Sequence, residues 1–199
     1  MRSGGGERIG VFGGTFDPVH VGHLVAAVNT RHALSLDRVL LVVANHPWQK
    51  RDRSVSAPEH RLTMVTAATA GIAGLEASSL EIERGGESYT ADTLEALAAA
   101  EPGGELFLVV GADVVSELPS WRRVDRVAAL ATLAVVARPG TPVVDPGPGW
   151  RTERVDIPGL DVSASDLRRR AAAGLPLDFL VPAPVIDVIA RLGLYAGRR

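Results

Sequence analysis

Residues 8–24 read RIGVFGGTFDPVHVGHL, and the order of residue types in this stretch decides the fold. The run RIGVFG at 8–13 is largely apolar, which predicts a buried strand. The strand ends at Gly13 and Gly14, a Thr-Phe-Asp-Pro turn follows, and a helical pattern occupies 21–34. A strand that ends in glycines and leads into a helix is typical of an open parallel sheet, whose ligands bind at the carboxyl ends of the strands.

The rest of the chain alternates short apolar runs with longer helical patterns, which predicts an α/β fold. Further strands are expected at 38–44, 75–83, 105–112 and 132–138, and further helices at 58–70, 90–100, 163–173 and 184–192. A capping pattern of Ser56, Pro58 and Glu59 marks the start of the helix at 58. Because several strands are apolar throughout, helices should cover both faces of the sheet. We expect a doubly wound, Rossmann-like parallel sheet of five to six strands, with C-terminal helices from about residue 163, in one domain over 1–199.

Composition narrows the function classes. The 199 residues include no cysteine, which excludes disulfides and thiolate chemistry. A net charge of −2 gives no general attraction to nucleic acid or to an anionic membrane, so neither is expected as a partner. The N-terminus shows no secretory signal, and the longest apolar run, VAALATLAVVA, is far shorter than the roughly 20 residues that span a bilayer. We therefore expect a soluble, cytoplasmic protein.

Two histidines stand at the start of the first helix. His20 and His23 lie three residues apart, so their rings should share one face. A glycine-rich turn beside a helix N-terminus attracts anions, which favours a phosphate site. The alternatives are a zinc pair and two incidental surface histidines; zinc usually needs a third protein ligand, and no other cluster with ligand spacing stands out. Neither the P-loop pattern nor the dinucleotide-binding glycine pattern is present.

Two motifs carry a resemblance to a known superfamily. GGTFDPVHVGHL (13–24) resembles the signature of the nucleotidyltransferases with an H-x-G-H motif, whose members transfer a nucleoside monophosphate from a triphosphate. VSASDLRRR (162–170) resembles their second motif, I-S-S-T-x-x-R. In that second motif Ser163 and Asp166 predict a helix cap, and Ser165 and Arg168 lie one turn apart, where they could reach the β- and γ-phosphates.

The second motif departs from the superfamily pattern at Ala164 and Ser165, where Ser and Thr are usual. Ser165 keeps a hydroxyl, but Ala164 lacks one, so no side-chain role is assigned to Ala164.

Four more stretches resemble the bacterial nicotinate-mononucleotide adenylyltransferases: ANHPWQK (44–50), ESYTADTLEAL (87–97), VVGADVVSELPSW (109–121) and ARPG (137–140). The resemblance implies an enzyme of NAD biosynthesis that transfers AMP from ATP to nicotinate mononucleotide, with deamido-NAD and pyrophosphate as products. The loop at 44–50 departs from the family's Pro-Pro-His-Lys pattern, so His46 and Trp48 receive no role.

The resemblance also implies a set of site residues. The catalytic residues are expected to be His20, His23 and Arg168. The residues expected to bind ATP are Gly13, Gly14, Thr15, Phe16, His20, His23, Gly111, Asp113, Ser165 and Arg168. The residues expected to bind nicotinate mononucleotide are Lys50, Ser88, Tyr89, Thr90, Trp121 and Arg138.

Physical chemistry agrees with the acceptor assignment. Trp121 can stack on a pyridine ring, and the helix start at Thr90 favours a carboxylate over a neutral amide. Structural roles remain open beside these: a tryptophan that closes the core, a simple N-cap, and, for Lys50, a surface lysine.

Because the acceptor phosphate is already an anion, no general base is expected, and catalysis reduces to positioning and charge stabilisation. Mg²⁺ should be bound mainly through the ATP phosphates, without a protein metal site. Alternatives are an adenylyltransferase that uses NMN or phosphopantetheine, and a nucleotide-binding regulator without catalysis. A homo-oligomer is compatible with the sequence.

Overall fold

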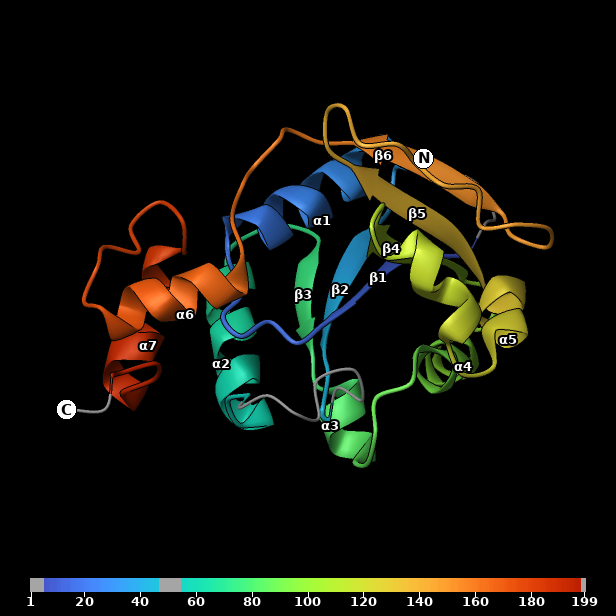
Figure 1. The fold of residues 1–199 in the computed structure, drawn as a ribbon. Coiled ribbons are helices and arrows are strands. Elements are labelled where there is room, and N and C mark those ends of the chain that lie inside the picture. The colour runs from blue at the N-terminus through green and yellow to red at the C-terminus, as the bar shows by residue number, and fades with distance from the viewer. Residues whose placement is uncertain (1–5, 47–54, 198–199) are drawn as a thin grey trace.

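The computed structural model describes residues 6–46 and 55–197. Within those ranges six strands form one sheet, and all neighbouring strands are parallel. The strands are β1 (Arg8–Gly14), β2 (Arg38–Val43), β3 (Leu75–Ser78), β4 (Glu105–Gly111), β5 (Ala131–Ala137) and β6 (Thr152–Asp156). Their order across the sheet is β3-β2-β1-β4-β5-β6 (Figure 1).

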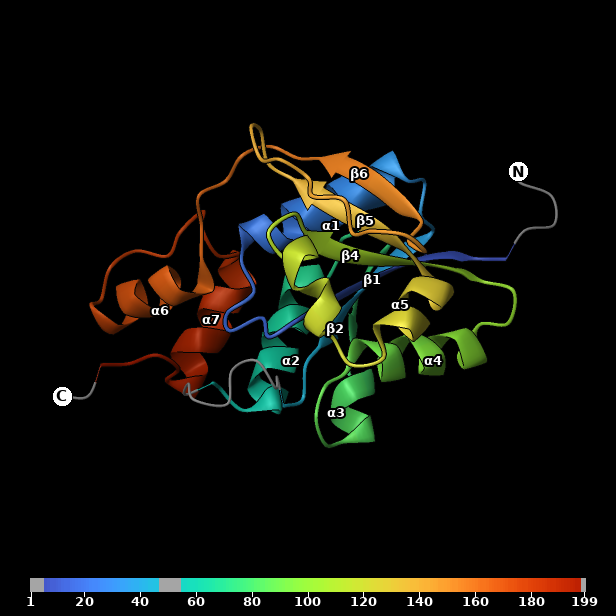
Figure 2. The same ribbon diagram turned by 45° about the vertical axis from the view of Figure 1, so that its right-hand side comes forward.

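Helices cover both faces of this sheet (Figures 1 and 2). One face carries α1 (Val21–Ala33) and α2 (Pro58–Thr69), with α7 (Ala183–Leu192) packed on α2 and α6 (Ala164–Ala172) beside α7. The other face carries α4 (Thr90–Ala100), the 3-10 helix η2 (Val115–Ser120) and α5 (Val124–Leu130). The short α3 (Leu80–Arg84) follows β3. The prediction of a doubly wound parallel sheet is confirmed.

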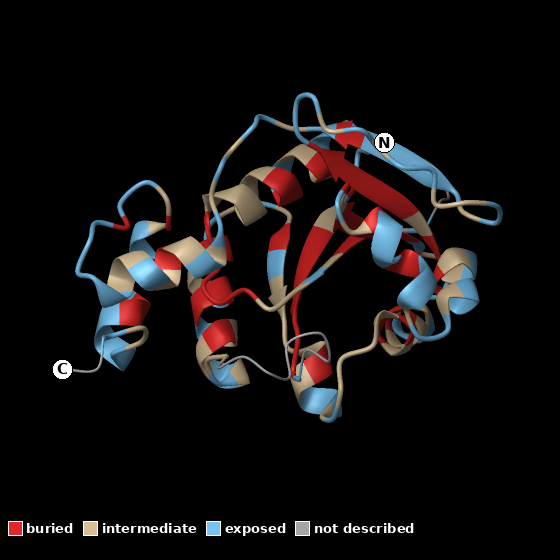
Figure 3. Ribbon diagram, viewed as in Figure 1, coloured by how far each residue is buried: buried red, intermediate tan, exposed pale blue. Residues whose placement is uncertain are grey.

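Burial alternates along β2 in a way that explains its apolar sequence. Val39, Leu41 and Val43 belong to the core under α1 and α2. Leu40 and Val42 belong to the core under α4 and α5. Because both faces are covered, every position from Val39 to Val43 is buried, and the inner strands such as β2 and β5 form the buried centre of the molecule (Figure 3).

The direction of the chain across the sheet reverses at β1. The chain passes from β1 outward to β2 and β3, then returns to place β4 on the other side of β1. Gly14, the last residue of β1, pairs with Val43, the last residue of β2, while Val11 pairs with Leu108 of β4. At such a reversal the connections leave in opposite directions, which opens a crevice at the carboxyl ends of the strands.

The strand predicted at 75–83 is wrong beyond Ser78, because residues 80–84 form α3. The alternation of apolar and polar residues in LEASSLEIE mimics a strand. In the structure the Glu81 side chain is instead buried and accepts a hydrogen bond from Thr93 Oγ1 at 2.5 Å. The helical turn at 80–84 is therefore accompanied by a hydrogen bond to α4. The local sequence pattern gives no sign of this distant contact.

Two elements were not predicted. β6 has only Val155 buried, because it forms the edge of the sheet, so it lacks the hydrophobic signal of the inner strands. The helix α5 ends at Leu130 and β5 begins at Ala131, without a glycine or proline between them. The boundary is therefore hidden inside one apolar run.

The two predicted helix caps have different outcomes. Ser163 is the N-cap of α6, and its hydroxyl accepts a hydrogen bond from the Asp166 amide at 3.2 Å, as predicted. The cap predicted at Ser56 is wrong, because the N-cap of α2 is Ala57. The Ser56 amide instead donates to the Asp17 carboxylate at 3.1 Å.

None of the helices in the described part of the chain is long and apolar enough to cross a membrane.

Candidate active site

Two cavities open at the carboxyl ends of β1 and β4. The larger, of about 720 Å³, lies between the loop after β1, the start of α1 and the start of α6. We call it the histidine cavity, because His20 and His23 line it. The smaller, of about 240 Å³, reaches the start of α4 and contains Trp121, so we call it the tryptophan cavity. Both are lined by Phe12, Gly14, Thr15, Val110, Gly111 and Val114.

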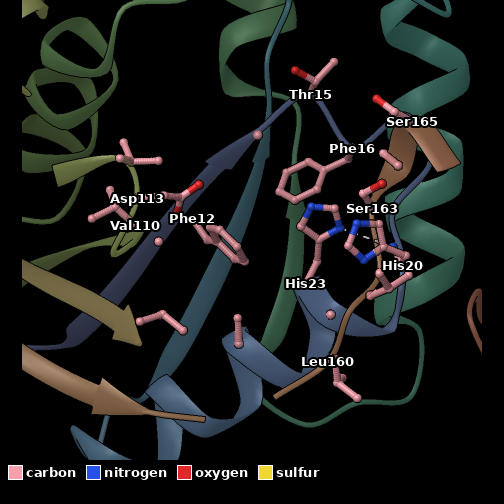
Figure 4. Close-up of a pocket in the computed structure, with 18 of the residues that line it drawn as sticks. Phe12, Thr15, Phe16, His20, His23, Val110, Asp113, Leu160, Ser163 and Ser165 are labelled. Atoms are coloured by element: carbon pink, nitrogen blue, oxygen red, sulfur yellow. Dashed lines mark hydrogen bonds between the residues drawn. The ribbon is translucent and has the colours of Figure 1, made fainter. Parts of the chain in front are cut away.

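The two histidines form a stacked pair at the start of α1. Their ring centroids are 3.7 Å apart and their planes differ by 28°. The backbone N–H of His20, the N-cap residue, donates to Nδ1 of His23 at 3.2 Å. As an acceptor, Nδ1 carries no proton, so the ring proton of His23 is on Nε2. Figure 4 shows the pair between Phe12 and Asp113 on one side and Ser163 and Ser165 on the other.

His20 is an uncharged histidine at neutral pH. Burial, together with the positive charge of Arg138, lowers the pKa of His20 from 6.5 to about 4. Its Nδ1 is buried and has no hydrogen-bond partner among the described residues. The ring can therefore serve as a neutral hydrogen-bonding group, but not as a permanent cation.

The glycines of the first motif allow close packing around these rings. A Cβ at Gly22 would lie 3.1 Å from Nδ1 of His20 and 3.0 Å from Val162 Cγ1, tighter than ordinary contact. A Cβ at Gly14 would lie 2.7 Å from the ring of Phe16. Phe16 in turn meets the His23 ring edge-on, at 5.0 Å between centroids. The glycine between the two histidines is thus explained by the space that His20 requires.

The second motif lies against the loop of the first. Arg168 on α6 donates from Nη1 to the carbonyl oxygen of Asp17 at 2.7 Å, and from Nη2 to Ser165 Oγ at 3.4 Å. Ser165 and Arg168 both line the histidine cavity, as do Gly111 and Asp113 at the end of β4. The structure therefore brings the predicted ATP-binding residues of three distant segments to one cavity, except Gly13, which lines only the tryptophan cavity.

The tryptophan cavity collects most of the predicted acceptor residues, Ser88, Tyr89, Thr90 and Trp121. Thr90 is the first residue of α4, as predicted, and Ser88 Oγ accepts the amide of Asn45 at 2.8 Å. Nε1 of Trp121 is buried and unpartnered within the described residues.

One predicted acceptor residue, Arg138, lies elsewhere, and another falls outside the described residues. Arg138 lines the histidine cavity, where its charge acts on His20. Lys50 lies outside the described residues, as does Trp48.

Sequence reasoning did not identify Arg122, which lines the tryptophan cavity. Its guanidinium carbon lies 4.7 Å from the centroid of the Tyr89 ring, within the range of a cation–π contact. The sequence feature that could have indicated Arg122 is its position directly after Trp121.

Arg61 is a second residue that sequence reasoning did not identify. It is 1% exposed, and its guanidinium donates to three backbone carbonyls, of Thr15 at 2.9 Å, Asn45 at 3.0 Å and Ser56 at 2.8 Å. It therefore ties the ends of β1 and β2 to the start of α2. The signal was an arginine on the apolar face of a helix, in line with Met64 and Val65.

No group of three or more histidine, aspartate or glutamate side chains in 6–46 and 55–197 is placed to hold a metal ion.

Comparisons with known proteins identify the family to which this chain belongs. The family model described as cytidylyltransferase-like matches residues 11–170, which include both motifs. The chain belongs to this cytidylyltransferase-like family, which confirms the superfamily inferred from the two motifs.

Within the family it groups with the nicotinate-nucleotide adenylyltransferases. A protein of Corynebacterium kroppenstedtii named "Probable nicotinate-nucleotide adenylyltransferase" is 43% identical over 191 residues, covering 94% of this chain and 90% of its own. One of Saccharopolyspora erythraea with the same name is 42% identical over 192 residues, covering 96% and 91%.

The fold has a solved counterpart. The Plasmodium falciparum nicotinic acid mononucleotide adenylyltransferase, solved in complex with NaAD, superimposes with a TM-score of 0.75 at 18% identity, over 95% of this chain and 97% of the other. At that identity the comparison supports the fold.

Proposed function

We propose that this protein transfers AMP from ATP to nicotinate mononucleotide, giving deamido-NAD and pyrophosphate. The observation that carries the proposal is the pair of cavities that share the wall at Gly14 and Thr15, with His23 beside it. The histidine cavity offers groups that can bind phosphates, and the tryptophan cavity offers an aromatic and cationic lining. Two substrates bound in them would meet at the loop after β1. The names of the relatives agree with this reaction.

In the proposed reaction, an oxygen of the acceptor's 5′-phosphate attacks the α-phosphorus of ATP. The new phosphorus–oxygen bond forms as the bond to the bridging oxygen of the β-phosphate breaks, and pyrophosphate leaves with that electron pair. The attacking oxygen is already anionic, so no side chain has to remove a proton. What the protein supplies is alignment and stabilisation of negative charge in the transition state.

The histidine cavity supplies that stabilisation. His23 presents a protonated Nε2, because its Nδ1 accepts the His20 amide. This nitrogen would donate to an oxygen of the α-phosphate. Arg168 and Ser165 would bind the β- and γ-phosphates that become the leaving pyrophosphate. Arg138 lines the same cavity, so we assign its charge to ATP rather than to the acceptor.

We propose that Mg²⁺ enters this cavity with ATP, held mainly by phosphate oxygens and water, where it would neutralise charge on the triphosphate.

The tryptophan cavity suits the nicotinate ring. Trp121 and Tyr89 provide aromatic faces for a pyridine. The N-terminus of α4 at Thr90 and the guanidinium of Arg122 both favour an anionic carboxylate over a neutral amide. These two features support nicotinate mononucleotide over NMN as the acceptor.

The direct test uses purified protein with ATP and Mg²⁺, and in separate reactions nicotinate mononucleotide, NMN or phosphopantetheine. Mass spectrometry identifies the products. Deamido-NAD as the dominant product would support the proposal. NAD or dephospho-coenzyme A as the dominant product would contradict the acceptor assignment and keep the phosphate chemistry. ATP binding without any product would favour the non-catalytic regulator.

A further inference from the structure

We propose that Tyr195, which lies outside both nucleotidyltransferase motifs, is a positioning residue for the loop that carries the histidine pair. It acts through the buried carboxylate of Asp17. The inference deepens the proposed function and rests on it for its kinetic consequence. The loop concerned runs from the end of β1 at Gly14 to the start of α1 at Val21.

The contact joins the two ends of the chain. The hydroxyl of Tyr195, in the segment after α7, donates to Oδ1 of Asp17 at 2.5 Å, across 178 residues of sequence. Burial and the neighbouring carboxylate both raise the pKa of Tyr195, so the hydroxyl keeps its proton and remains a donor. The same oxygen lies 3.8 Å from Sδ of Met64 on α2.

Asp17 is the point at which several segments converge. Its side chain is 3% exposed, and Oδ2 accepts the amide of Ser56, just before α2. Its main-chain carbonyl accepts Nη1 of Arg168. The carboxylate therefore fixes the loop to the C-terminal segment and to α2, while its carbonyl holds the arginine of the second motif. Asp17 also lines the histidine cavity.

Loss of the Tyr195 hydroxyl would leave a buried carboxylate oxygen without its donor. A buried acceptor that loses its partner carries a desolvation penalty, so Asp17 would move toward water or toward another donor. Three residues further on is His20, whose amide sets the orientation of His23. A misplacement of about 1 Å at a reacting centre can cost on the order of 100-fold in rate. The tryptophan cavity is not lined by Asp17 or Tyr195, so acceptor binding should be spared.

The test is the Tyr195→Phe variant of the full chain, with Met64→Leu as its matched control. Tyr195→Phe removes one oxygen and keeps the ring. Met64→Leu removes the sulfur that contacts the same hydroxyl and leaves the Asp17 hydrogen bond in place. Steady-state kinetics with ATP and nicotinate mononucleotide give kcat and both KM values, calorimetry gives the Kd for ATP, and a thermal melt gives Tm.

We expect Tyr195→Phe to lower kcat by about tenfold and to weaken ATP binding about threefold, with the KM for nicotinate mononucleotide within about twofold of wild type. Met64→Leu should retain wild-type kcat. In a double-mutant cycle with Asp17→Asn, the fold-loss of kcat in the double variant should be smaller than the product of the fold-losses in the two single variants. The reason is that both substitutions act on one hydrogen bond.

Several outcomes would overturn the inference. These are an unchanged kcat in Tyr195→Phe, an equal loss in Met64→Leu, or a lowered kcat that merely follows a lowered folded fraction. If the wild-type protein turned over none of the acceptors, the proposed function would fail. The positioning role would then be decided by ATP binding alone: unchanged affinity in Tyr195→Phe would reject it.

Discussion

Replacing His20 with asparagine should remove a large part of the protein's sensitivity to acid. In the folded state burial and Arg138 hold the pKa of His20 at about 4, against 6.5 for a free histidine. The unfolded chain therefore binds a proton at this position between pH 6.5 and 4, where the folded protein does not. Stability consequently rises with pH across that window and is lost as the pH falls through it.

The size of the effect follows from the two pKa values. One pKa unit corresponds to about 1.4 kcal/mol, so the full shift costs the native state about 3 kcal/mol below pH 4. At pH 5 about 2 kcal/mol of that loss is already present. The His20→Asn variant does not titrate here, and asparagine is a favourable N-cap, so α1 keeps its start.

The assay is urea unfolding, followed by tryptophan fluorescence at pH 7.5 and pH 5. Between these two values the free energy of unfolding of wild type should fall by about 2 kcal/mol more than that of His20→Asn. With a slope of about 2 kcal/mol per molar urea, this amounts to about 1 M in the difference between midpoint shifts. His32→Asn is the matched control, because His32 is exposed on the same helix. Equal pH dependence in wild type and His20→Asn would refute the reasoning.

Three further substitutions test separate parts of the site. His23→Ala should lower kcat by about 10²–10³-fold, as for a lost oxyanion donor, and near-normal kcat would remove His23 from the chemistry. Arg122→Gln should lower kcat/KM for nicotinate mononucleotide about tenfold and change that for NMN much less; equal losses in parallel kinetics would exclude a contact with the carboxylate. Arg61→Met should lower the free energy of unfolding by about 3 kcal/mol, because three backbone carbonyls lose their donor. A urea midpoint close to that of wild type would show that water replaces the guanidinium.

The sequence determined the elements whose signal is local. Apolar runs such as 38–44 predict strands covered on both faces, and the glycine turn before His20 predicts a binding loop at a strand end. The histidine pair, the cap at Ser163 and the helix start at Thr90 are local patterns as well. Each was identified because a few neighbouring residues are sufficient to specify it. By contrast, α3 was predicted as a strand, because its turn is accompanied by a contact with a distant helix.

Only the tertiary structure decided which distant residues meet. The order of strands places β4 beside β1 rather than beyond β3, and Arg138, which follows β5, lines the histidine cavity rather than the tryptophan cavity. The same packing brings Tyr195 to Asp17, and Arg61 to the ends of two strands. Periodicity along the chain records which face of an element is buried, but not what that face is buried against. That information exists only once the sheet has assembled and the helices have packed on it.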